Sequence, residues 1–128
     1  MARKILLIDD DVAFLELMGE TIRSWGYEVI VATRGKEATE IIKNKNADIV
    51  VLDYLMPDMD GMATLKEIRK IDKKVPVIMF TGCSDIKVIE GTEELGVVLI
   101  SKLSSYQDAK ATLEVIIQTI DKKLDKQN

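Results

Sequence analysis

Acidic, hydroxyl and amino side chains follow four short apolar runs of this chain, and all of these groups can take part in chemistry. Asp9, Asp10 and Asp11 follow Lys4–Ile8, Asp53 follows Asp48–Leu52, Thr81 follows Pro76–Phe80, and Ser101 and Lys102 follow Val97–Ile100. The chain has no histidine, which excludes histidine-based general base catalysis and the usual zinc sites. Its chemistry must therefore use carboxylates, hydroxyls, lysines and a metal ion that prefers oxygen ligands.

The elements that position these residues alternate between short apolar runs and longer amphipathic segments, which predicts the order βαβαβαβαβα. The predicted strands are Lys4–Ile8, Tyr27–Ala32, Asp48–Leu52, Pro76–Phe80 and Val97–Ile100. The predicted helices are Val12 to about Ser24, Lys36 to about Asn44, Met62 to about Ile71, Asp85–Leu95, and Ser105 to about Leu124. Strands that are apolar throughout are buried on both faces, as in a parallel sheet covered by helices. The sequence therefore predicts an α/β fold.

The length of 128 residues suits one domain, which we predict over residues 1–124 with a solvated end at 125–128. The net charge of −4 disfavours direct binding to nucleic acid, because no basic patch is there to neutralise phosphates. No apolar run approaches the ~20 residues that span a membrane. The single cysteine, Cys83, permits no intrachain disulfide and is typical of a reducing compartment. We therefore expect a cytoplasmic protein.

The carboxyl ends of parallel strands lie at one edge of a sheet, where ligands bind in folds of this kind. Carboxylates that converge there repel one another unless a cation lies between them. Oxygen ligands suit Mg²⁺, which also keeps waters and substrate phosphate oxygens around it. Asp53 can then attack phosphorus as a nucleophile and give an aspartyl phosphate. Mg²⁺, Lys102 and the hydroxyl of Thr81 supply the positioning and charge neutralisation that phosphoryl transfer needs.

Over almost its whole length the chain resembles the receiver domains of two-component response regulators. The segments that carry the resemblance are KILLIDDD at 4–11, VVLDYLMPDMDG at 50–61, PVIMFTG at 76–82 and SK at 101–102. The resemblance implies a doubly wound five-stranded parallel sheet in the flavodoxin-like order 2-1-3-4-5, flanked by five helices. It also implies a domain that takes a phosphoryl group from a histidine kinase or phosphotransfer protein. Such a domain is not an enzyme beyond its own phosphorylation and dephosphorylation.

The roles of individual residues in that family transfer to matching positions of this chain. Asp53 matches the phosphorylated aspartate, Thr81 the switch hydroxyl, and Lys102 the lysine that pairs with the phosphate. The ligands of Mg²⁺ match four positions: Asp9, Asp10, Asp53 and the main-chain carbonyl of Leu55. Asp11 matches no ligand position, and we expect it to cap the helix that follows it.

The first predicted helix has more apolar residues than one core face requires. In related receivers the exposed part of this helix docks the histidine-bearing helices of the kinase. We therefore expect Phe14, Leu15 and Met18 to form the surface that meets the kinase. The output passes either through protein contacts of this domain or to a further domain, and we expect no contact with a membrane.

Two positions depart from the family pattern. Leu103 follows Lys102, where the family usually has a proline, and Leu99 stands where an aromatic switch residue is common. We therefore expect an intact metal and phosphate site with an altered readout. This departure keeps open an alternative, a pseudo-receiver that binds partners without phosphorylation. A second alternative is a Mg²⁺-dependent phosphohydrolase, although the chain lacks room for a substrate cap and a general acid.

Overall fold

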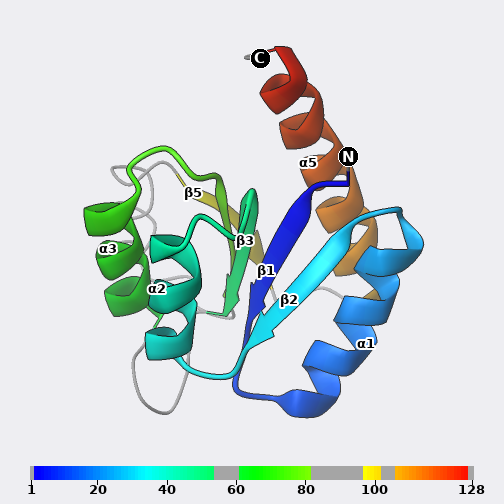
Figure 1. Cartoon of the computed structure of the whole chain (residues 1–128). Helices are drawn as coiled ribbons and strands as arrows, with labels where there is room; N and C mark the ends of the chain where they lie inside the picture. The colour runs from blue at the N-terminus through cyan, green and yellow to red at the C-terminus, as the bar shows by residue number, and fades with distance from the viewer. Residues whose placement is uncertain (1, 54–60, 82–96, 102–105, 127–128) are drawn as a thin grey trace.

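The computed structural model describes residues 2–53, 61–81, 97–101 and 106–126. Five parallel strands form one sheet in the order β2-β1-β3-β4-β5 (Figure 1). The strands are β1 (Lys4–Ile8), β2 (Glu28–Ala32), β3 (Ile49–Asp53), β4 (Val77–Thr81) and β5 (Val97–Ser101). The helices are α1 (Val12–Ser24), α2 (Gly35–Lys43), α3 (Gly61–Ile71) and α5 (Tyr106–Lys126). The predicted α/β fold and strand order are confirmed, and the predicted helix over 85–95 lies outside the described residues.

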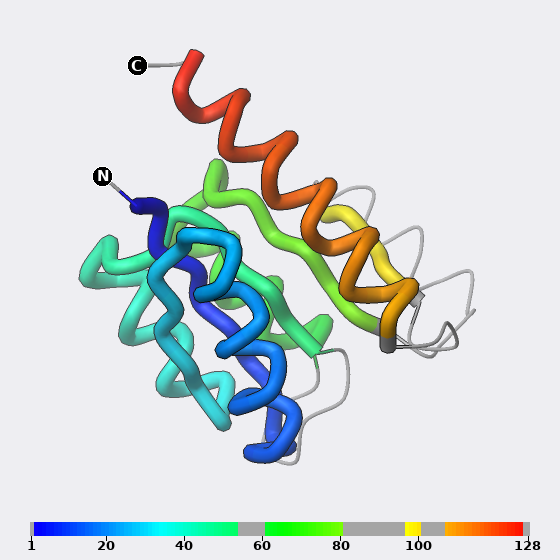
Figure 2. Tube along the Cα trace, turned by 90° about the vertical axis from the view of Figure 1, so that its right-hand side faces the viewer, coloured from blue at the N-terminus to red at the C-terminus, as the bar shows by residue number. Residues whose placement is uncertain are grey.

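The helices cover both faces of the sheet, with α1 and α5 on one face and α2 and α3 on the other (Figures 1 and 2). Each face has its own core. Strand β1 contributes Ile5 and Leu7 to the core under α1 and α5, and Leu6 and Ile8 to the core under α2 and α3. Because side chains alternate along a strand, a strand between two helical layers needs apolar residues at every position.

Helix α1 has a signal for its start and another for its end. The side chain of Asp11 accepts a hydrogen bond from the main-chain N–H of Phe14 at 3.1 Å, so the predicted capping role of Asp11 is confirmed. Just past the end of the helix, Gly26 has a φ of 98°, a conformation that side-chain-bearing residues rarely adopt. The N–H of Gly26 donates to the carbonyl of Arg23 at 2.9 Å. These two residues fix the limits of α1.

Helix α5 extends past the predicted domain end at 124 and is tied to the start of β1. Nε of Arg3 donates to Oδ1 of Asp121 at 2.8 Å, and the same guanidinium forms an ion pair with Asp125. The hydroxyl of Tyr27 donates to Oδ2 of Asp121 at 3.4 Å. Burial and the negative charge of Asp121 raise the pKa of Tyr27. No helix in the described ranges, α5 included, is long and apolar enough to cross a membrane.

The hydroxyl of Thr64, on the buried face of α3, has no hydrogen-bond partner in the described part of the chain. A buried hydroxyl of this kind costs about 1–3 kcal/mol, and valine has nearly the same shape. We expect Thr64→Val to raise the free energy of unfolding by about 1 kcal/mol, measured by urea denaturation. The control is Thr119→Val, because the exposed Thr119 hydroxyl donates to the carbonyl of Val115 at 2.8 Å. A Thr64→Val variant less stable than the parent would contradict this prediction.

Candidate functional site

The carboxylates of Asp9, Asp10 and Asp53 come together at the carboxyl ends of β1 and β3. One carboxylate oxygen from each residue lies within 4.8 Å of the other two. Strands β1 and β3 are neighbours, with Ile8 paired to Leu52. The residues after Ile8 therefore meet the last residue of β3 across the sheet. The structure thus brings together three of the residues that the sequence predicts for the site.

The three acids differ in burial. Asp9 and Asp53 are buried, whereas Asp10 is exposed. The main-chain N–H of Asp11 donates to Oδ1 of Asp9 at 3.0 Å, and the N–H of Asp9 donates to the carbonyl of Ala32 at 3.1 Å. These bonds fix Asp9 where the chain turns into α1. Clustered carboxylates that are partly buried and open to solvent on one side fit a hard divalent cation, which would relieve their mutual repulsion.

Two further residues that the sequence predicts for this edge, Thr81 and Ser101, are the last residues of β4 and β5. Thr81 is the last residue of β4, in which the preceding Phe80 pairs with Asp53. Ser101 pairs with Thr81 at the end of β5. The main chain of Thr81 therefore lies at the same edge of the sheet as the acid cluster. Lys102 and Leu55 lie outside the described residues.

Two of the three residues predicted to face the kinase are instead part of the core. Leu15 is 3% exposed and Met18 is 0% exposed. Phe14 is partly buried, and its ring meets the ring of Phe80 edge-on with centroids 6.2 Å apart. The buried stripe of α1 has the spacing i, i+3, i+4, i+7: Leu15, Met18, Gly19 and Ile22. The prediction that Leu15 and Met18 form a docking surface is therefore wrong.

The surplus apolar residues of α1 are Val12 and Leu17. They are 56% and 51% exposed. The sequence indicates that α1 has apolar residues to spare, but the helical period alone does not say which side faces the sheet. Sequence reasoning also missed the contact of Phe14 with Phe80. No local signal pairs an aromatic residue on a helix with one on a strand that follows much later.

The comparisons with known proteins agree with this architecture. The family model for the response regulator receiver domain matches residues 5–114. The chain is 33% identical over 111 residues to the transcriptional regulatory protein ZraR of Escherichia coli strain K12, covering 86% of this chain and 25% of that protein. It is 34% identical over 96 residues to sporulation initiation phosphotransferase F of Bacillus subtilis, covering 75% of this chain and 77% of that protein. The chain thus spans about a quarter of the length of ZraR.

Solved structures of receiver domains share the fold. A CheY-like receiver domain protein from Methanospirillum hungatei JF-1 has a TM-score of 0.85 and 26% identity, covering 98% of this chain and 99% of that one. CheY in the CheX–CheY–BeF₃–Mg²⁺ complex of Borrelia burgdorferi has a TM-score of 0.81 and 29% identity, covering 92% of this chain and 88% of that one. The chain belongs to the receiver domain family of the response regulators of two-component signalling.

Proposed function

We propose that this domain takes a phosphoryl group from the phosphohistidine of a kinase or phosphotransfer protein onto Asp53, with Mg²⁺ held by Asp9, Asp10 and Asp53. The observation that carries the proposal is the meeting of these carboxylates within 4.8 Å at one edge of the sheet. Two relatives support it. One is named as a phosphotransferase, and the other was solved with BeF₃, a mimic of a phosphoryl group, together with Mg²⁺.

In the proposed reaction, an oxygen of the Asp53 carboxylate forms a bond to phosphorus as the bond from phosphorus to the donor's imidazole nitrogen breaks. The electron pair of the broken bond stays on that nitrogen. Asp9 and Asp10 hold the cation, which when bound neutralises negative charge on the phosphoryl oxygens. The hydroxyl of Thr81 and the ammonium of Lys102 take up the same oxygens through hydrogen bonds. Water later hydrolyses the aspartyl phosphate, and the domain acts on no other substrate.

Positioning accounts for most of the catalysis in such a transfer. Asp53 is suited to this because it is the buried last residue of a central strand, with neighbouring strands on both sides. Its main chain pairs with Phe80 of β4, and the preceding residue, Leu52, pairs with Ile8 of β1. A nucleophile fixed in this way loses little conformational freedom when the donor arrives.

The test is incubation of the chain with acetyl phosphate and Mg²⁺, followed by intact-mass measurement. We expect a gain of one phosphoryl group that disappears when EDTA removes the metal. No gain with Mg²⁺, under conditions that label a characterised receiver, would contradict the proposal and favour the pseudo-receiver. Continuous release of phosphate from small phosphate esters would instead favour the phosphohydrolase.

We propose that the exposed apolar residues of α1, Val12 and Leu17, contact the kinase in place of Leu15 and Met18. We expect Leu17→Asp to slow transfer from a phosphorylated kinase by about tenfold, since a well-buried interface residue contributes on the order of 1 kcal/mol or more. Labelling by acetyl phosphate should be unchanged, because Leu17 lies outside both cores. The control is Val115→Asp, which changes an apolar residue on α5 that is also more than half exposed. Equal slowing in both variants, or with both donors, would contradict this surface.

A further inference from the structure

Strand β2 is at the edge of the sheet and has a neighbouring strand on one side only. The N–H of Glu28 donates to the carbonyl of Arg3 at 3.0 Å, and the carbonyl of Ala32 accepts from the N–H of Asp9 at 3.1 Å. Main-chain groups alternate in direction along a strand, so those of Val29 and Val31 point away from β1. An edge of this kind is a template on which another strand can pair.

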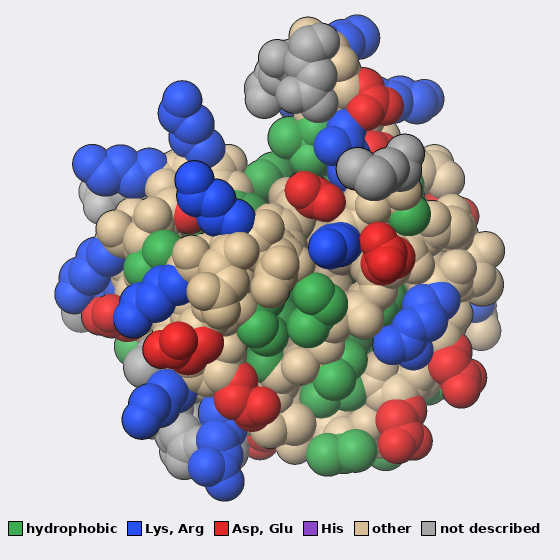
Figure 3. Space-filling view, viewed as in Figure 1, with side chains coloured by type: hydrophobic (Ala, Val, Ile, Leu, Met, Phe, Trp, Pro, Cys, Tyr) green, Lys and Arg blue, Asp and Glu red, His purple; other side chains and the backbone are tan. Residues whose placement is uncertain are grey.

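The side chains along this edge favour such pairing. Strand β2 reads EVIVA, with one charged residue at its start and β-branched residues at three of its five positions. Val31 is 45% exposed. Figure 3 shows this side of the molecule, where hydrophobic side chains gather in the centre and lower part and charged side chains surround them. Short β-branched segments without proline or internal charge have a high tendency to self-associate.

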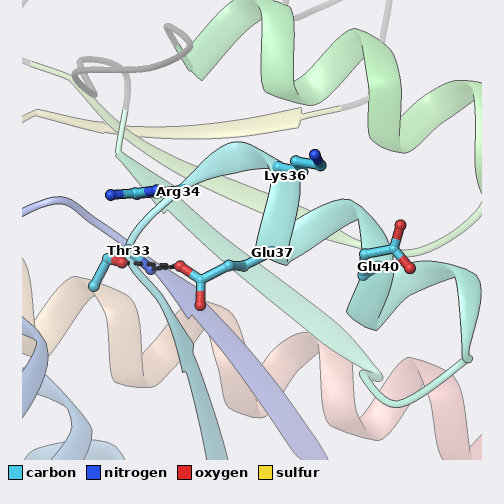
Figure 4. Close-up of a pocket in the computed structure, with 5 residues that line it drawn as sticks. All are labelled: Thr33, Arg34, Lys36, Glu37 and Glu40. Atoms are coloured by element: carbon cyan, nitrogen blue, oxygen red, sulfur yellow. Dashed lines mark hydrogen bonds between the residues drawn. The ribbon is translucent and has the colours of Figure 1, made fainter.

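Two charged side chains, one from α1 and one from α2, form hydrogen bonds with main-chain groups along this edge. Nη2 of Arg23, in the last turn of α1, donates to the carbonyl of Val29 at 3.4 Å. Oε1 of Glu37, in the first turn of α2, accepts from the N–H of Thr33 at 3.3 Å and from its hydroxyl at 2.9 Å (Figure 4). Val29 lies near the start of β2 and Thr33 directly follows its end. The edge is therefore covered near both ends by a charge.

Two copies of this chain could pair antiparallel, centred on Ile30. That pairing would need the same carbonyl of Val29 and N–H of Thr33 that now bond to Arg23 and Glu37. In that register Val29 of one copy lies opposite Val31 of the other, and their mutual bonds use the carbonyl of Val29. The next bonded pair joins Tyr27 to Thr33 and uses the N–H of Thr33. No like charges meet, because Glu28 would oppose an alanine. The β2 edge is thus complementary to itself about a two-fold axis.

We propose that Arg23 and Glu37 keep this chain from pairing with a second copy of itself through β2. A charged side chain that covers an edge opposes strand addition, because pairing must displace it and leave its charge beside the new sheet. Removal of both side chains exposes the carbonyl of Val29 and the N–H of Thr33. The β2 edge then becomes a homodimer interface.

The test compares the variant Arg23→Ala/Glu37→Ala with the parent by size-exclusion chromatography and light scattering across a concentration series. We expect self-association to strengthen by at least about tenfold, equivalent to about 1.4 kcal/mol. Hydrogen exchange at the amide of Val31 should slow as the dimer forms. The control Glu40→Ala/Lys43→Ala removes an acid and a base that pair with each other at 3.7 Å on α2. It should behave as the parent does.

A third variant adds Val31→Lys to the double variant and places a charge in the middle of the edge. It should return the protein to the association state of the parent. The proposal is overturned if the double variant associates no more than its control, or if Val31→Lys fails to reverse the association. If the double variant does not fold, the self-association of Glu37→Ala is compared with that of Glu40→Ala, and the same outcomes apply. That single change uncovers one end of the edge and should still strengthen association.

Discussion

With acetyl phosphate and Mg²⁺, the Asp53→Asn variant is expected to keep its unmodified mass while the parent gains one phosphoryl group. Asparagine has the shape of aspartate but carries an amide, which is neutral and does not form a stable bond to phosphorus under these conditions. The change also removes one of the three carboxylates that lie within 4.8 Å of one another. Labelling should therefore be lost completely, as judged by intact-mass measurement after a fixed incubation.

The matched control is Asp11→Asn, which makes the same chemical change beside the cluster. The side chain of Asp11 caps α1 through the N–H of Phe14, and asparagine is an equally good capping residue. This variant should therefore fold and take up the phosphoryl group as the parent does. A mass gain that survives in Asp53→Asn would show that another residue carries the phosphoryl group.

The second large effect is expected in the stability that Mg²⁺ confers. A ligand that binds only the folded state at ten times its Kd adds about 1.4 kcal/mol to the free energy of unfolding. We expect the parent to gain this much as MgCl₂ is raised, and Asp10→Ala to gain little, because only Asp9 and Asp53 would remain of the clustered carboxylates. Urea denaturation at several Mg²⁺ concentrations measures both gains.

Without Mg²⁺ the parent should no longer be the more stable of the two proteins. Asp10 is exposed and lies beside two buried carboxylates, so its removal relieves repulsion between like charges. Asp10→Ala should then be at least as stable as the parent. NaCl at matched ionic strength controls for general screening. An equal gain from MgCl₂ in both proteins would exclude Asp10 as a ligand.

The strands of the site were predicted from their apolar runs, and three of them extend one residue further. Strands β3, β4 and β5 end at Asp53, Thr81 and Ser101, whereas the apolar runs end one residue earlier. An apolar run marks burial, but a strand continues as long as its main chain pairs with a neighbour. Asp53 pairs with Phe80, and Thr81 pairs with Ser101. Asp53 and Thr81 are thus part of the sheet, whereas Asp9 and Asp10 follow the end of β1.

What the sequence could not provide is the set of contacts between distant residues. The period of α1 predicts a helix, but the side that meets the sheet depends on how Leu15 and Met18 pack against other elements. The pairs Arg3 with Asp121 and Arg23 with Val29 likewise depend on the complete fold. The motif residues were easier to predict because parallel strands bring their carboxyl ends to one edge whatever the details of packing.

The contacts of Arg3 with α5 place the two described ends of the chain near each other. The last turns of α5 lie beside the start of β1, at the end of the sheet opposite the acid cluster (Figure 1). The strands between these two poles are five residues long, or about 16 Å. A segment joined before residue 2 or after residue 126 therefore leaves from the far pole. Under the proposed function, a phosphoryl donor would approach the pole of the acid cluster, and a segment joined at either end would leave from the opposite pole.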